Sequence, residues 1–162
     1  MRASPPSRPP GSGPAPNPSP SSHHYRIVFA QCGDAVCVPI GIDFVRRALT
    51  ECRDEVHPTD ADSAPPDADA LLVAGELLAN AHNHAGGPCS LDLDCAEGRL
   101  RIQVTDRSQE RPHPRLPHRA EQIGGHGLYI IDRLSASWGS TPGSDGKTVW
   151  AELSGATRAE PG

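Results

Sequence analysis

Two polar side chains in an otherwise apolar segment, residues 70–85, are the strongest candidates for chemistry: Glu76 and, four positions later, Asn80. Residues four apart in a helix lie on the same face, so the carboxylate and the amide would project together. An amide oxygen suits Mg²⁺, which takes oxygen ligands, and the carboxylate could orient or deprotonate a nucleophilic hydroxyl. A lone carboxylate in apolar surroundings also costs free energy unless it is paired. The alternative is therefore structural, with Glu76 paired to an arginine of a neighbouring strand such as Arg99 or Arg101.

The helix that must position this pair is predicted over residues 67–85. Asp67 lies in its first turn, where a carboxylate favours the helix dipole, and the Gly-Gly-Pro run at 86–88 ends it. A polar strip is expected along Glu76, Asn80 and Asn83, flanked by Leu72, Val73 and Leu77. The opposite, apolar face is expected to consist of Leu71, Ala74, Leu78, Ala81 and Ala85.

Three further positions could contact a ligand, although each has an ordinary alternative. Asp106 follows a predicted strand and could accept a hydrogen bond from an exocyclic amine, or it could simply begin a turn. Gly125 and Gly127 precede a predicted helix, whose N-terminal amides attract anions, but such glycines also serve tight turns. The hydroxyl of Thr148 could hold water beneath a base, or Thr148 could be an ordinary β-branched strand residue.

A long loop, residues 107–123, separates Asp106 from these glycines. Its prolines forbid a continuous helix, and a loop of this length in a compact domain is usually functional or mobile. It could form a basic flap over a polyphosphate or a solvated charged loop. The basic residues concerned are Arg107, Arg111, Arg115 and Arg119, with His113 and His118.

The remaining pattern predicts a two-layer α/β sandwich of the α+β kind, with helices gathered on one face of a sheet. Strands are expected at 25–30, 90–95, 100–105, 137–141 and 147–153, and helices at 39–52, 67–85 and 128–135. The pairs 90–95 with 100–105 and 137–141 with 147–153 read as hairpins around glycine-containing turns.

The composition indicates one domain, residues 23–153, between two tails. Residues 1–22 hold eight of the 18 prolines and should be disordered, and residues 154–162 form the second tail. The net charge of −5 argues against nucleic-acid binding. No run resembles a signal peptide or a membrane span, which predicts a cytoplasmic protein without membrane contact. Five cysteines without a C-x-x-C pair predict reduced thiols.

Four segments, in this order, resemble the GHKL ATPase superfamily in the form seen in anti-sigma factor serine kinases. Residues 76–85 (ELLANAHNHA) resemble its N box, and residues 104–106 (VTD) resemble the start of the box whose Asp binds adenine. Residues 125–134 (GHGLYIIDRL), followed by Trp138 and Gly139, resemble the glycine box and its helix. Residues 146–153 (GKTVWAEL) resemble the closing strand, so the resemblance extends from about residue 25 to 153.

This resemblance implies a Bergerat-type fold with a mixed β-sheet, and ATP held between the helices and a lid. It implies a serine/threonine protein kinase with Glu76 as the catalytic base and Mg²⁺ at Asn80. The implied ATP-binding residues are Asn80, Asp106, Gly125, Gly127, Leu128 and Thr148. The implied partners are a sigma factor and a STAS-type anti-anti-sigma protein, with a homodimer as a further option.

The chain departs from the family pattern at two places. Residues 107–110 stand where Gly-x-Gly is often found after the adenine Asp, and His126 stands where Arg is common. The alternative function is therefore a non-catalytic, partner-binding regulator of transcription with weak or no ATP binding.

Overall fold

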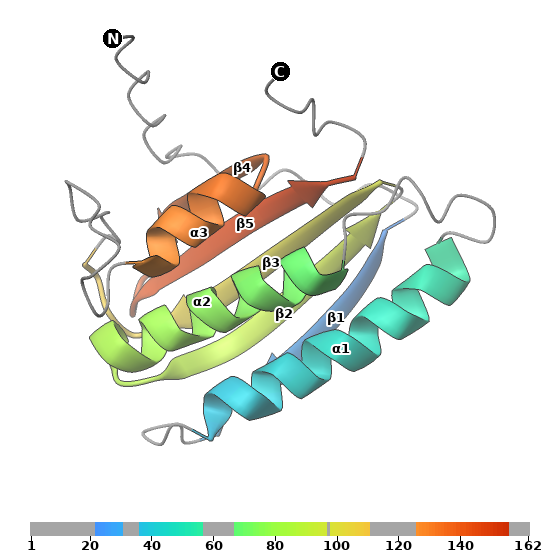
Figure 1. Cartoon of the computed structure of the whole chain (residues 1–162). Helices are drawn as coiled ribbons and strands as arrows, with labels where there is room; N and C mark the ends of the chain where they lie inside the picture. The colour runs from blue at the N-terminus through green and yellow to red at the C-terminus, as the bar shows by residue number, and fades with distance from the viewer. Residues whose placement is uncertain (1–21, 31–35, 57–66, 97, 111–125, 156–162) are drawn as a thin grey trace, which may run out of the picture.

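The computed structural model describes residues 22–30, 36–56, 67–96, 98–110 and 126–155. Within them the chain forms five strands and three helices (Figure 1). In chain order these are β1 (His23–Val28), α1 (Cys37–Val56), α2 (Asp67–Ala85), β2 (Pro88–Ala96), β3 (Arg99–Asp106), α3 (His126–Leu134), β4 (Ser137–Pro142) and β5 (Lys147–Ser154). Every predicted element is confirmed, with ends that shift by a few residues.

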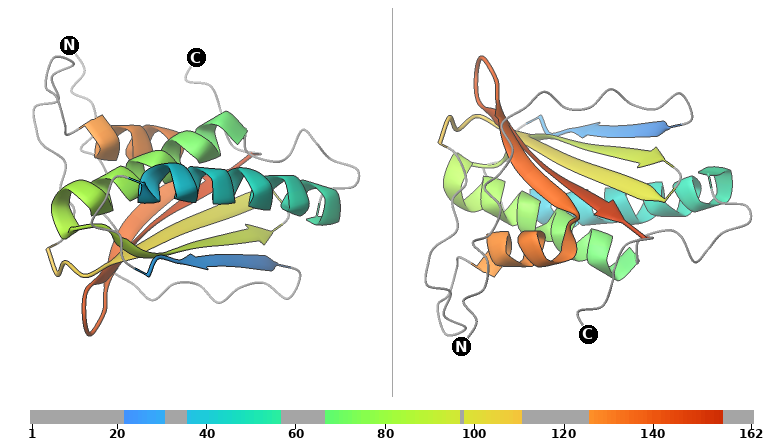
Figure 2. Two further views of the ribbon diagram at one scale, coloured as in Figure 1. Left: turned by 90° about the horizontal axis from the view of Figure 1, so that it is seen from below. Right: turned by 90° about the horizontal axis from the view of Figure 1, so that it is seen from above.

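The sheet has the order β1-β2-β3-β5-β4, and its three helices lie on one face (Figures 1 and 2). The predicted two-layer architecture is confirmed, but all four described strand pairings are antiparallel, where a mixed sheet was expected. The reason is the position of the last hairpin. β3 and β4 run in the same direction, but β5 returns between them and pairs antiparallel with both.

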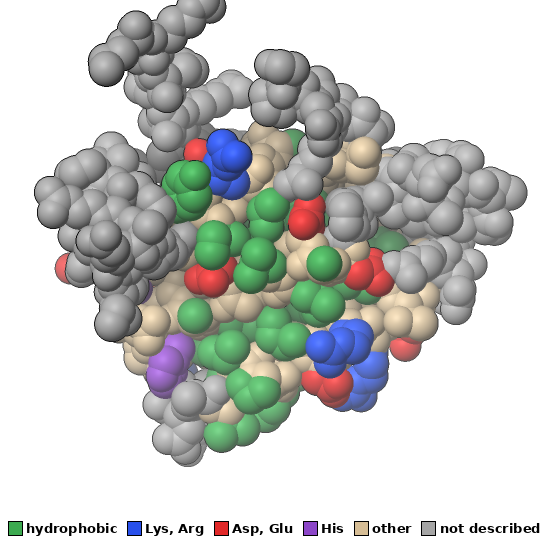
Figure 3. Space-filling model, viewed as in Figure 1, with side chains coloured by type: hydrophobic (Ala, Val, Ile, Leu, Met, Phe, Trp, Pro, Cys, Tyr) green, Lys and Arg blue, Asp and Glu red, His purple; other side chains and the backbone are tan. Residues whose placement is uncertain are grey.

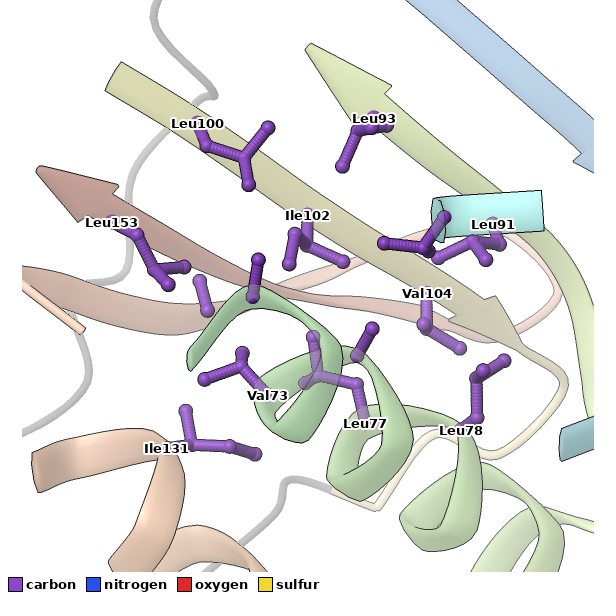
Figure 4. Close-up of a cluster of buried hydrophobic side chains, with 14 of the residues drawn as sticks. Val73, Leu77, Leu78, Leu91, Leu93, Leu100, Ile102, Val104, Ile131 and Leu153 are labelled. Carbon is purple, nitrogen blue, oxygen red and sulfur yellow. The ribbon is translucent and has the colours of Figure 1, made fainter. Parts of the chain in front are cut away.

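The core lies between the sheet and the helices, where alternate residues of β2, β3 and β5 meet α2 and α3 (Figure 4). On α2 the buried residues are Ala70, Val73, Ala74, Leu77, Leu78 and Ala81. The predicted apolar face is confirmed for Ala74, Leu78 and Ala81, but the buried stripe is wider than predicted. It also takes in Val73 and Leu77, which were expected beside the polar strip and are fully buried. The cause is tertiary packing, because α2 contacts α1, α3 and the sheet and so buries a wider stripe than one apolar row.

The helical layer exposes some hydrophobic surface to solvent (Figure 3). Ile40, Leu72 and Tyr129 are each more than two-fifths exposed. Among the described residues, no helix is long and apolar enough to cross a membrane. Cys52, Cys89 and Cys95 carry free thiols, whereas Cys37 is disulfide-bonded, so the prediction of reduced thiols is wrong for Cys37.

Candidate functional site

The end of β3, the start of β5 and the C-terminal end of α2 lie at the same end of the sheet, at the left of Figure 1. Asp106 ends β3 and pairs with both Pro88, the first residue of β2, and Lys147, the first residue of β5. Only two glycines separate α2 from Pro88, so the C-terminal end of α2 lies at this same end. The C-terminal end of α3 leads into Ser137 of β4, which pairs with Glu152 near the opposite end of the sheet. The N-terminal end of α3 therefore points toward Asp106.

Glu76 of α2 lies against the first turn of α3. A Cβ atom added to Gly127 would stand 2.8 Å from Oε2 of Glu76, closer than real side chains approach. Glycine at this position is what allows the α3 backbone to come so near. The first amides of a helix have no intrahelical acceptor and carry a partial positive charge, so they favour an ionised carboxylate and other anions nearby.

Asn80 lies one helical turn beyond Glu76 and is half-buried. The turn carries it toward the end of α2 that adjoins β2 and Asp106. Because residues four apart lie on the same side of a helix, Asn80 follows Glu76 along α2 toward the end of the sheet.

Asp106 is almost completely buried and already has polar partners. Its side chain is 1% exposed, and Nζ of Lys147 lies 3.0 Å from both of its carboxylate oxygens. The backbone N–H of Ser108 donates a third hydrogen bond to Oδ1, at 2.8 Å. Burying two charges is costly unless they are paired, and here each charge has the other as its partner.

The turn between β4 and β5 is pressed against the end of β3. A Cβ added to Gly146 would fall 1.9 Å from the carbonyl oxygen of Asp106 and 2.8 Å from Cα of Arg107. Only glycine fits there, and its close approach holds Lys147 directly beside Asp106.

Sequence reasoning assigned the support of Asp106 to Thr148, but the side chain that contacts the carboxylate is Lys147. Side chains alternate along a strand, so Thr148 lies on the other face of the sheet, where its hydroxyl bonds to that of Thr105 at 2.9 Å. The sequence contains a pattern that predicts this. Lys147 lies two residues before Val149, so in a strand it is on the same, buried face as Val149 and the alternate residues after it.

The alternative role for Glu76 was an ion pair with Arg99 or Arg101, but these two arginines pair with a different carboxylate. Arg99 and Arg101 both lie 3.6 Å from Glu152, on the sheet face away from the helices. Arg101 also stacks on Trp150, with 4.2 Å between the guanidinium carbon and the ring centroid. Burial lowers the pKa of Arg101, and the Glu152 carboxylate acts in the opposite direction.

The other predicted positions are placed as follows. Leu128 is buried in the core below the first turn of α3. Gly125, Arg111, Arg115 and Arg119, with His113 and His118, lie outside the described residues, and Arg107 is exposed. A hollow of about 330 Å³ lies elsewhere, between β1 and α1, and none of the predicted site residues lines it.

The arrangement suits a ligand that has an anionic end and a polar ring. The anionic end would face the α3 N-terminus beside Glu76 and Asn80, and the ring would face the Asp106–Lys147 pair. A family model described as a histidine kinase-like ATPase domain matches residues 41–153, which include all of these positions. A search of curated proteins found no match.

Proposed function

This chain belongs to the histidine kinase-like ATPase domain family, and on that premise we propose that it is an ATP-binding anti-sigma factor. In this proposal it acts as a serine/threonine protein kinase on a hydroxyl of a STAS-type anti-anti-sigma partner, and it also binds a sigma factor. The observation that carries the proposal is the contact between Glu76 and Gly127, which brings a carboxylate to the N-terminus of α3.

Each residue has a distinct task in the proposed reaction. The amides at the start of α3 bind phosphate oxygens, and Asp106 accepts a hydrogen bond from the amine of adenine. Asn80 would hold Mg²⁺ through its amide oxygen, and the ion would neutralise charge on the phosphates. Glu76 accepts the proton of the attacking hydroxyl.

Phosphoryl transfer tests the proposal. The protein is incubated with Mg²⁺, γ-labelled ATP and an anti-anti-sigma protein from its host, and label on the partner is measured. Glu76→Gln should bind ATP normally but transfer label about 10²- to 10⁴-fold more slowly, as expected when a general base is lost. Asp43→Asn, which changes an exposed carboxylate on α1 in the same way, is the matched control and should transfer at the normal rate. Normal transfer by Glu76→Gln would show that Glu76 is not the base.

A second candidate function is a partner-binding regulator that does not transfer phosphate. It is favoured by the contacts of Asp106, whose carboxylate is already neutralised by Lys147 and bonded to Ser108 without a nucleotide. Titration calorimetry with ATP and Mg²⁺ separates the two candidates. Absence of heat, together with an unchanged melting temperature, would favour the regulator.

A further inference from the structure

The buried pair at the end of the sheet has hydrogen-bonding capacity that its described contacts do not use. A carboxylate can accept about four hydrogen bonds. Among the described residues, Oδ1 of Asp106 takes two, from Ser108 and Lys147, and Oδ2 takes one, from Lys147. Within the described part of the chain, one acceptor position therefore remains, and it is on Oδ2.

Lys147 has the complementary capacity. An ammonium group has three N–H donors, and the contacts described for Lys147 are to the two oxygens of one carboxylate. As far as the described residues go, at least one N–H of Lys147 therefore remains unused. Its Nζ lies 3.0 Å from Oδ2, and both residues belong to the buried, helix-facing rows of their strands. Both side chains are at most 5% exposed, so an unused donor or acceptor here costs more than it would in water.

From this geometry we infer that the base of the nucleotide is recognised by the Asp106–Lys147 pair and not by Asp106 alone. The inference rests on the proposed ATP binding. The pair presents one acceptor next to one donor, and adenine presents the complement, an amine donor on C6 next to the ring acceptor N1. Oδ2 of Asp106 accepts from the amine, and Lys147 donates to N1. Lys147 is then a specificity-determining residue at the base end of the site.

The inference is tested by removing the N1 acceptor from the ligand and the Lys147 donor from the protein. Titration calorimetry compares ATP with 1-deaza-ATP, in which N1 is replaced by C–H, for the wild-type chain and for Lys147→Met. The wild type should bind 1-deaza-ATP at least tenfold more weakly than ATP. Lys147→Met should bind the two nucleotides within about twofold of each other, because it has no donor to lose. Arg133→Met, which removes an exposed cation on α3, is the matched control and should keep the tenfold preference.

Because Lys147→Met leaves Asp106 buried without its cation, folding is checked by circular dichroism. If this variant does not fold, the double variant Asp106→Leu with Lys147→Met replaces it, since that pair is neutral and has no hydrogen-bond donor, and it too should bind both nucleotides alike. Two results would overturn the role of Lys147 while leaving ATP binding intact. One is that the wild type and the variant lose the same affinity on going from ATP to 1-deaza-ATP, and the other is that the wild type binds both nucleotides equally. A wild-type chain that binds neither nucleotide would overturn the proposed function as well.

Discussion

Replacing Gly127 with alanine should separate stability from phosphoryl transfer. The new methyl group would stand 2.8 Å from Oε2 of Glu76, about 0.6 Å short of an ordinary contact of 3.4 Å. The atom in the way is the end of a flexible side chain, so the carboxylate can yield while the backbone stays in place. We therefore expect the variant to fold and Glu76 to be displaced.

The opposing free-energy terms are similar in size. Moving the Glu76 side chain off its preferred rotamer costs about 0.5–1.5 kcal/mol. Alanine in place of glycine within a helix gains up to about 1 kcal/mol. The free energy of unfolding should therefore fall by no more than about 1.5 kcal/mol. Transfer should fall much further, by about 10- to 100-fold, since misplacing a reacting group by 1 Å can cost about 100-fold.

Urea denaturation measures the first quantity, and label transfer to the partner measures the second. Gly75→Ala is the matched control, because its methyl group would meet Cδ1 of Ile42 at 3.4 Å, an ordinary contact. It should be as stable as the wild type or up to about 1 kcal/mol more stable, with unchanged transfer. A Gly127→Ala variant that transfers at the wild-type rate would refute the placement of Glu76 at the reacting hydroxyl. A loss of more than about 3 kcal/mol would show that the carboxylate is rigidly held and cannot move aside.

Three further changes give distinct outcomes. Gly146→Ala places a methyl group 1.9 Å from the backbone oxygen of Asp106. We expect urea denaturation to show a free energy of unfolding lower by about 3 kcal/mol. A variant as stable as the wild type would contradict the close approach of this turn. Lys147→Met should cost about 3–5 kcal/mol by leaving the Asp106 carboxylate unpaired, and Asp106→Asn in the same chain should restore much of it in a double-mutant cycle. The hydrogen bond with Cys52, together with burial, raises the pKa of Cys95 above its ordinary value of 9.0. The unfolded chain therefore ionises this thiol first, and stability that is fully present below pH 9 should fall by about 1.4 kcal/mol per pH unit above it. Cys95→Ala should have a shallower slope, and an unchanged slope would exclude Cys95 as its source.

Local signals in the sequence were sufficient for the elements themselves. The boundaries of α2 follow from a carboxylate at its start and two glycines after its end, and both glycines have positive φ angles, 72° at Gly86 and 118° at Gly87. The turn between β2 and β3 likewise contains Gly98, with φ 69°. These signals depend on residues close in the chain, so they can be read without knowing the fold.

Features that depend on distant parts of the chain could not be read in this way. The burial of Val73 and Leu77 depends on how α2 sits against α3, which lies about 50 residues further along the chain. The role of Lys147 depends on the register that places it opposite Asp106, 41 residues earlier. Family resemblance directed attention to Thr148, whereas strand alternation and register select its neighbour.

The central position of β5 bears on when the site can form during synthesis. β5 is the last of the described strands in chain order, yet it lies between β3 and β4 and supplies the lysine beside Asp106. A nascent chain that has emerged only as far as β4 has an unpaired β3 edge and an uncompensated carboxylate at its end. The Asp106–Lys147 pair is therefore completed only when β5 inserts. If the chain binds ATP as proposed, a ribosome-bound chain should gain nucleotide affinity only after that strand has left the exit tunnel.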